Sequence, residues 1–251
     1  MQPAAEGVLE IAREIVRQRY SGAACAFVAG SIMRGQGTTS SDVDLVVVFD
    51  RLDAAWREPF VQGGFPVEAF VHDPSTLAWF MDEDARNGHP VLAHMVAEGQ
   101  QVGDDEGLAQ ALKQDAAERM LRGPGSLADA RSKELRYIIT DLMEDLRGDR
   151  TAAEIRAISA SLYQPLADLT LLGRGVWSGK GKWVPRLLHK QDSELAVQFD
   201  EAFRAAANGQ GSILRAFTES ELSRNGGAFF AGDRRQAPVS ARRTKESDLP
   251  T

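Results

Sequence analysis

Residues 27–49 read FVAGSIMRGQGTTSSDVDLVVVF, and this stretch decides the fold. It begins inside a short apolar run, residues 23–29, which stops at Gly30 and predicts a buried strand. A polar spacer of ten residues follows Ser31. A second run, residues 43–49, is rich in valine and predicts another strand. The chain therefore forms two buried strands joined by a polar loop that contains several glycines.

Two carboxylates open the second of these strands. Asp42 and Asp44 stand two residues apart, so they project from one face, while Val43 and Leu45 turn to the other. Neighbouring carboxylates repel one another, and an ionised pair near a core is costly without a cation. Oxygen ligands on a rigid strand suit Mg²⁺, which commonly also binds the phosphate oxygens of a substrate. The pair predicts a magnesium site.

The turn before the spacer predicts an anion site. Glycine at position 30 lets a phosphate approach the backbone closely. A short helix beginning at Ser31 would present free N–H groups to that phosphate, and the serine hydroxyl would add a donor. Arg34 follows within one turn, so its side chain can reach the same anion.

A third carboxylate, Glu68, lies in the middle of an alternating run, residues 65–71, that predicts a third strand. With Asp42 and Asp44 it would complete a site for two divalent ions, which clamp the attacking and leaving oxygens of an in-line displacement. Pro66 lies near the start of this run and predicts either an edge strand or the entry to a strand.

These residues together resemble the nucleotidyltransferase superfamily. The shared features are Gly30-Ser31, the spacer, the Asp42-x-Asp44 pair and a later acidic residue in a strand, here Glu68. The wording of the motif, GSxxRGxxxxxSDxDL, is similar to that of small bacterial members, including the aminoglycoside nucleotidyltransferases.

The resemblance implies an α+β fold: a nucleotidyltransferase domain with a small mixed sheet and flanking helices, followed by a C-terminal helical bundle. It implies Mg²⁺, two ions in the fullest form, and ATP or another NTP as substrate. It also implies transfer of a nucleoside monophosphate to an acceptor hydroxyl with release of pyrophosphate. By the resemblance, Ser31 contacts phosphates, and Asp42 and Asp44 hold metal, with Glu68 as the third ligand.

After about residue 105 the sequence pattern changes: segments that predict both strands and helices give way to segments that predict helices alone. Pro165 should kink or restart the long helix that contains it. A short extended piece is expected at 100–104, and helices are expected at 7–20, 89–98, 105–121, 126–146, 151–173, 192–208 and 210–224. We therefore expect a nucleotidyltransferase domain over 1–122, a helical acceptor-binding domain over 123–232 and a mobile polar tail over 233–251.

The expected helix over 126–146 offers candidates for the general base that would deprotonate the acceptor hydroxyl. Glu134, Asp141 and Asp145 share one stripe, and Asp141 is favoured because it should be partly buried at the border of the core. Lys180 and Lys182, in a glycine-rich basic loop, are expected to approach the outer phosphates. Two tryptophans that flank them, Trp177 and Trp183, are expected to pack the loop or stack on a base; core packing is the commoner role of tryptophan.

Composition limits the remaining function classes. The 251 residues carry a net charge of −7, which argues against a general nucleic-acid binder. No apolar run is long enough to span a membrane, and a single cysteine, Cys25, excludes an internal disulfide. These features favour a cytoplasmic protein. The four histidines lack metal-ligand spacing, and the sequence says nothing about oligomeric state.

The leading hypothesis is a magnesium-dependent transferase that modifies a small hydroxylated acceptor. An acidic chain suits a polycationic ligand, so an aminoglycoside is the expected acceptor and antibiotic resistance the expected role. Two alternatives stay open: the same chemistry on a protein side chain or an RNA end, and a nucleotide-binding regulatory module without turnover.

Overall fold

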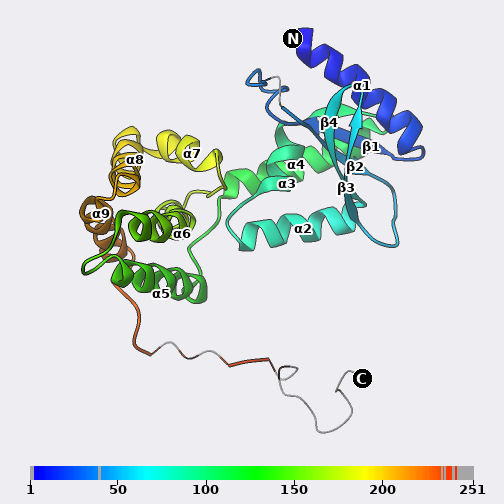
Figure 1. The fold of residues 1–251 in the computed structure, drawn as a ribbon. Coiled ribbons are helices and arrows are strands. Elements are labelled where there is room, and N and C mark those ends of the chain that lie inside the picture. The colour runs from blue at the N-terminus through cyan, green and yellow to red at the C-terminus, as the bar shows by residue number, and fades with distance from the viewer. Residues whose placement is uncertain (1–2, 39–40, 233, 235, 239–240, 242–251) are drawn as a thin grey trace, which may run out of the picture. The chain divides into compact units, whose positions relative to one another are not determined.

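The computed structural model describes residues 3–38, 41–232, 234, 236–238 and 241 (Figure 1). Most of the tail expected over 233–251 lies outside the described residues. The chain divides into two compact units, one formed by residues 1–127 with 170–197 and the other by residues 128–169 with 198–251. None of the helices that the structure describes is long and apolar enough to cross a membrane.

The first unit is built on a five-stranded mixed sheet. Its strands are β1 (Cys25–Ala29), β2 (Val43–Val48), β3 (Trp56–Gln62), β4 (Phe65–His72) and β5 (Gln100–Val102). Their order is β3-β4-β2-β1-β5. The pair β2 and β4 is parallel, and the other neighbours are antiparallel. The predicted α+β fold, a mixed sheet with flanking helices followed by a helical region, is confirmed.

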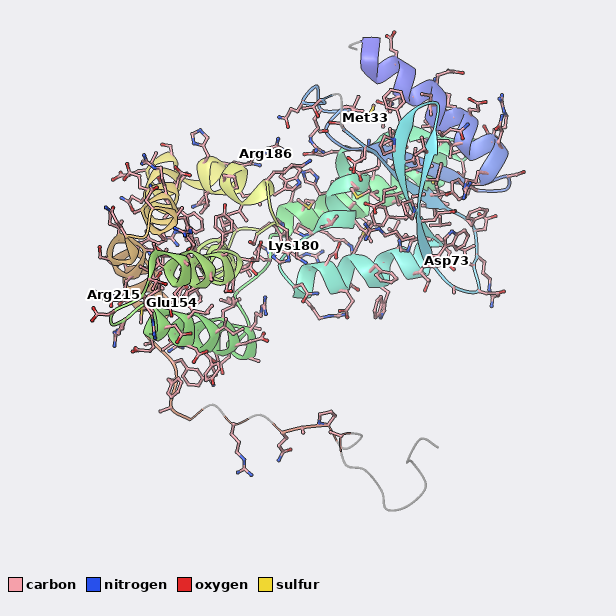
Figure 2. All side chains as sticks on the ribbon, viewed as in Figure 1. Met33, Asp73, Glu154, Lys180, Arg186 and Arg215 are labelled. Carbon is pink, nitrogen blue, oxygen red and sulfur yellow. The ribbon has the colours of Figure 1, made fainter. Side chains whose placement is uncertain are left out.

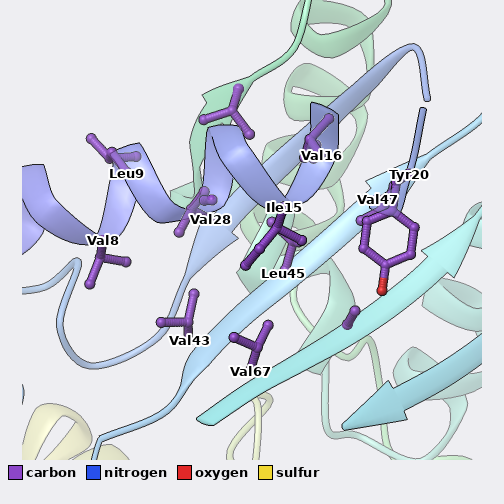
Figure 3. Packing of buried hydrophobic residues seen from close by; sticks show 14 of the residues in the cluster. Val8, Leu9, Ile15, Val16, Tyr20, Val28, Val43, Leu45, Val47 and Val67 are labelled. Carbon is purple, nitrogen blue, oxygen red and sulfur yellow. The ribbon is translucent and has the colours of Figure 1, made fainter. Parts of the chain in front are cut away.

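Helices cover both faces of this sheet, which is why its central strands read as continuous apolar runs. The helix α1 (Pro3–Arg19) lies on one face, where Val8 and Ile15 pack against Val43 and Leu45 of β2 (Figure 3). The helices α2 (Pro74–Arg86), α3 (Val91–Glu98) and α4 (Glu106–Arg122) supply the core of the opposite face. Asp44 lies between two residues that face α1, so it belongs to the opposite face.

The helix α2 begins at a capping box. The Asp73 carboxylate accepts a hydrogen bond from the Thr76 backbone N–H at 2.7 Å, and the Thr76 hydroxyl oxygen accepts one from the Asp73 N–H at 3.0 Å. Asp73 also accepts the N–H of Leu52 at 3.0 Å, so one side chain joins the end of β4, the loop after β2 and the start of α2 (Figure 2).

A segment distant in sequence, residues 170–197, packs with the first unit. The Ser178 backbone N–H donates to the Gly88 carbonyl at 2.9 Å, and Trp177 Nε1 donates to the Met120 carbonyl at 3.0 Å. Leu172 covers Gly88 so closely that a Cβ at position 88 would lie 2.6 Å from it. The predicted domain boundary at residue 123 assigns this whole segment to the helical domain. In the structure, the segment instead belongs to the compact unit that contains the sheet.

The second unit is helical. It contains α5 (Asp129–Asp145) and α9 (Gly211–Arg224), together with most of α6 (Ala152–Leu172) and α8 (Ser193–Ala207). Tyr163, Phe199 and Phe203 form an aromatic cluster with ring centroids 4.7–5.2 Å apart. This cluster gives the unit a core of its own.

Several local predictions are wrong. The sequence analysis missed β3, α2 and α7 (Trp183–Gln191), the last of which it took for part of a basic loop. Residues 31–35 form turns and not a helix, and α6 does not restart at Pro165.

Of the two positions predicted for Pro66, an edge strand or the entry to a strand, the entry is confirmed. Pro66 is the second residue of β4, and β3 pairs outside β4.

Replacing Leu45 by alanine should destabilise the first unit, because this side chain is fully buried beneath α1. We expect Leu45→Ala to lower the free energy of unfolding by about 2–5 kcal/mol in chemical denaturation. The control is Val61→Ala on the edge strand, whose side chain is 69% exposed; it should change stability by less than about 0.5 kcal/mol. Equal effects of the two variants would contradict this assignment of the core.

Candidate active site

A pocket opens in the first unit where β1 and β2 meet the returning segment 176–187. The residues that line it are of two kinds. The polar and charged ones include Gly30, Ser31, Arg34, Asp42, Asp44, Glu68, Lys180 and Lys182. The apolar and aromatic ones are Phe70, Pro90, Val91, Met95, Met120, Trp177, Trp183 and Leu187. Every residue that the sequence assigns to phosphate or metal binding lines this pocket, and the candidate bases Glu134, Asp141 and Asp145 do not.

The register of the sheet brings Asp44 beside Glu68. Asp44 of β2 pairs with Glu68 on the parallel strand β4 and with Ala29 at the end of β1. Burial, and after it the negative charges of Asp42 and Glu68, raise the pKa of Asp44 from its ordinary value of 3.8 to about 6. The positive charges of Arg34 and Lys182 act in the opposite direction. The pocket therefore concentrates carboxylates on one wall and cations around them.

Gly30 gives the Asp44 carboxylate its space. Its φ is +100°, a conformation that residues with a Cβ rarely adopt. A Cβ at this position would lie 3.1 Å from Asp44 Oδ2 and 3.3 Å from the Asp42 carbonyl oxygen. Both the backbone turn after β1 and the close approach of Asp44 therefore require glycine.

The loop after Gly30 is held by serine hydroxyls. Ser31 is buried, and its hydroxyl donates to Ser41 Oγ at 2.8 Å. Ser41 Oγ also accepts the Thr38 backbone N–H at 2.8 Å, which fixes the far end of the loop. The predicted helix N-terminus at Ser31 is absent from this described loop, because the Ser31 carbonyl accepts the Gln36 N–H at 2.8 Å in a turn.

Arg34 forms no salt bridge with the described residues, although its positive charge acts on Asp44 in the same pocket. Its guanidinium lies over the Trp183 ring, 4.9 Å from the centroid, and its Nε is buried without a hydrogen-bond partner in the described chain. The indole holds the guanidinium by a cation–π contact and leaves its charge available to the pocket. Arg34, Lys180 and Lys182 form the cationic part of the site.

Glu68 already has a cationic partner. Arg57 of β3 donates from Nε to Glu68 Oε1 at 2.5 Å, and its Nη2 donates to the same oxygen. Within the part of the chain that the structure describes, no group of three or more histidine, cysteine, aspartate or glutamate side chains is arranged to hold a metal ion. Of the three carboxylates that line the pocket, Asp42 and Asp44 form no salt bridge with the described residues, whereas Glu68 is paired with Arg57.

The candidate base on the helical unit does not line this pocket. Asp141 lies on α5, and the prediction that it is partly buried is wrong, because its side chain is exposed. The buried stripe of α5 contains Leu135, Ile139 and Met143, one position away from the acidic stripe. Asp145 is also exposed, and Glu134 is paired with Arg131 at 2.7 Å.

Sequence reasoning missed His94, which lines the pocket from α3. Its Nε2 lies 3.3 Å from Glu98 Oε1, and its ring packs edge-on against Trp183 with centroids 5.1 Å apart. Burial lowers its pKa from the ordinary value of 6.5. In the sequence, the only sign of this contact is the four-residue spacing of His94 and Glu98. That spacing predicts a pair on one helix face and does not predict that His94 lines a pocket.

This arrangement defines the class of protein. Paired carboxylates beside a glycine turn, faced by cations and an aromatic wall, suit a metal-bound polyphosphate with an attached base, and a nucleotidyltransferase needs such a site. The model of the family described as "Nucleotidyltransferase domain" matches residues 9–82. The chain therefore carries a nucleotidyltransferase domain, and the superfamily predicted from the motif is confirmed.

No curated protein matches the sequence. Among solved structures, a nucleotidyltransferase-like protein from Exiguobacterium sibiricum is similar, with a TM-score of 0.44 and 12% identity over 88% of this chain and 77% of that one.

Replacing Gly30 by alanine tests the space that Asp44 needs. We expect Gly30→Ala to lower the free energy of unfolding by about 1–2 kcal/mol and to impair Mn²⁺ binding, because the added methyl displaces the Asp44 carboxylate. Gly22→Ala is the matched control, since Gly22 has a φ of +92° but nothing within 4 Å of an added Cβ. It should lose similar stability and keep Mn²⁺ binding. Normal Mn²⁺ binding by folded Gly30→Ala would refute the argument.

Asp44 also makes stability depend on pH. Since its pKa is raised to about 6, the folded chain holds this proton more tightly than the unfolded chain. Its stabilising contribution is present below pH 4 and is lost as the pH rises to about 6. Without metal, Asp44→Asn should raise the free energy of unfolding at pH 8 by roughly 1–3 kcal/mol. Asp50→Asn, at an exposed position after β2, is the control; no gain for Asp44→Asn in urea titrations would contradict the raised pKa.

Proposed function

We propose that this chain transfers a nucleoside monophosphate from an NTP, with ATP the expected donor, to a hydroxyl of a small acceptor and releases pyrophosphate. The observation that carries the proposal is the convergence of Asp42, Asp44, Arg34, Lys180 and Lys182 on one pocket. Carboxylates alone would repel a triphosphate, and cations alone would bind it without placing a metal. Together they suit a nucleotide that arrives with a divalent ion.

Asp42 and Asp44 are the residues that would hold Mg²⁺. Their fit to a divalent cation rests on the chemistry of the pocket wall. The wall offers hard oxygen donors from two residues that stand two positions apart, and burial, with the charges of Asp42 and Glu68, destabilises the ionised form of Asp44. When bound, the ion would neutralise phosphate charge and align the reacting groups. A second ion would need Glu68, which Arg57 now engages.

The cationic side chains would orient the triphosphate. Arg34 has a buried Nε without a partner among the described atoms, and its guanidinium lies over the Trp183 ring, so it suits a fixed phosphate contact. Lys180 and Lys182 lie on the loop before α7 and would bind the outer phosphates and the departing pyrophosphate. The aromatic and aliphatic side of the pocket would receive the base.

The acceptor is the least constrained part of the proposal. The net charge of −7 suits a polycationic molecule, and an aminoglycoside is the candidate we favour. Asp141 stays a predicted general base on the second unit; its exposure leaves it accessible to an acceptor. Antibiotic resistance would follow from modification of such a drug.

The direct test is pyrophosphate release with ATP, Mg²⁺ and a panel of aminoglycosides. Asp42→Asn and Asp44→Asn should each lower turnover by at least about 100-fold, because each removes a carboxylate that would hold the ion. Asp50→Asn removes an exposed carboxylate outside the pocket and should leave turnover unchanged. Full activity in both pocket variants would refute the metal assignment.

Two further assays separate the alternatives. Labelled ATP incubated with cell lysate would reveal a protein or RNA acceptor if the small-molecule panel gives no product. ATP binding by calorimetry, with no product on any acceptor, would identify a regulatory module.

A further inference from the structure

Arg57 lies on the edge strand β3 and reaches across the sheet to the pocket wall. The register places Arg57 opposite Phe70 and Pro59 opposite Glu68, so Glu68 is the diagonal neighbour of Arg57. Two N–H groups of Arg57 donate to a single oxygen, Glu68 Oε1, and the guanidinium lies 5.1 Å from the centroid of the Phe70 ring. Both partners of Arg57 line the pocket.

The two ends of this ion pair differ in exposure. The Arg57 side chain is 61% exposed, whereas the Glu68 side chain is 24% exposed. Arg57 can therefore move into water without burying its charge, while Glu68 stays at the pocket. Exposed ion pairs contribute only about 0–1 kcal/mol, so a divalent cation in the pocket can compete with Arg57 for this carboxylate.

A role in holding the sheet together does not account for the pair. The strands β3 and β4 are already joined by a ladder that runs from Trp56 and Val71 to Gln62 and Phe65. On the opposite face of β3, Arg19 makes a comparable contact with Glu58 at 2.5 Å, which ties α1 to the sheet. The Arg57 pair, by contrast, joins the edge strand to a residue of the pocket.

We propose that Arg57 is an internal counter-cation that occupies Glu68 until a divalent ion held by Asp42 and Asp44 displaces it. Arg57 is thus a positioning residue that weakens metal binding and makes Glu68 a conditional third ligand. The inference rests on the metal site in the proposed function. It accounts for the absence, among described side chains, of a ready three-ligand cluster although three carboxylates line one pocket.

The test measures Mn²⁺ binding to the full chain without nucleotide. The electron paramagnetic resonance signal of free Mn²⁺ reports how much of the ion stays unbound. Removing the competitor in Arg57→Gln should tighten Mn²⁺ binding by about 2- to 5-fold, the range set by an exposed ion pair. Arg57→Lys keeps the charge but loses the two-pronged contact, and should give a smaller gain in affinity. Arg19→Gln removes an equal charge from α1, where Arg19 contacts Glu58 on the other face of β3, and should leave Mn²⁺ affinity unchanged.

A double variant separates exchange at Glu68 from a general change in charge. In a Glu68→Gln background, the Arg57→Gln change should no longer affect Mn²⁺ affinity. Unchanged or weaker binding in Arg57→Gln, or a gain that persists in the Glu68→Gln background, would overturn the inference. Thermal unfolding of each variant checks folding, and Arg57→Lys decides the question if Arg57→Gln does not fold.

The wild-type chain and Asp44→Asn show which proposal has failed. Mn²⁺ binding that Asp44→Asn abolishes, combined with no effect of Arg57→Gln, overturns the inference and leaves the proposed function standing. Absence of Mn²⁺ binding by the wild-type chain overturns both.

Discussion

Repulsion between carboxylates on one wall of the pocket is the constraint on which the rest of the first unit depends. Parallel pairing of β2 with β4 sets Asp44 beside Glu68. Asp42, two residues before Asp44, lines the same pocket. Burial makes ionised Asp44 costly, so the wall is stable only with positive charge nearby. That charge comes from Arg34, Lys182 and Arg57, which the chain supplies from three separate segments.

The compensating cations depend on packing that is remote in sequence. Trp183 contacts Arg34 and belongs to the segment 170–197. This segment follows α5 and most of α6 in the sequence, yet it packs with the first unit. Two hydrogen bonds, from Ser178 and Trp177, hold this segment on the first unit. Each is worth only about 1 kcal/mol, so apolar contacts such as Leu172 over Gly88 must contribute much of the attachment.

The helical unit shows the limits of reasoning from periodicity. The acids of α5 repeat at helical spacing, which suggested a functional stripe near the core. The buried stripe is offset by one position, and a shift of one residue turns a side chain by about 100° around a helix. Thr140 is buried on that stripe, where its hydroxyl oxygen accepts the Phe229 N–H at 3.0 Å, and the neighbouring Asp141 is exposed. A single helix pattern could not reveal this partner from residues 226–230.

The sequence by itself determined the central strands and the paired aspartates, because these features are local and follow from alternation along a strand, and it determined the glycine turn, which is equally local. The class of enzyme came from the resemblance of this motif to the nucleotidyltransferase superfamily. Only the tertiary structure decided that Arg57 engages Glu68, that His94 reaches the pocket and that the segment before α7 joins the sheet. Each of these contacts joins residues whose proximity depends on strand order or on helix packing, and no local pattern records either. The edge strand β3 is an example, because its residues are largely exposed and show no clear strand pattern. Its contribution to the site depends on its pairing with β4, which brings Arg57 near Glu68.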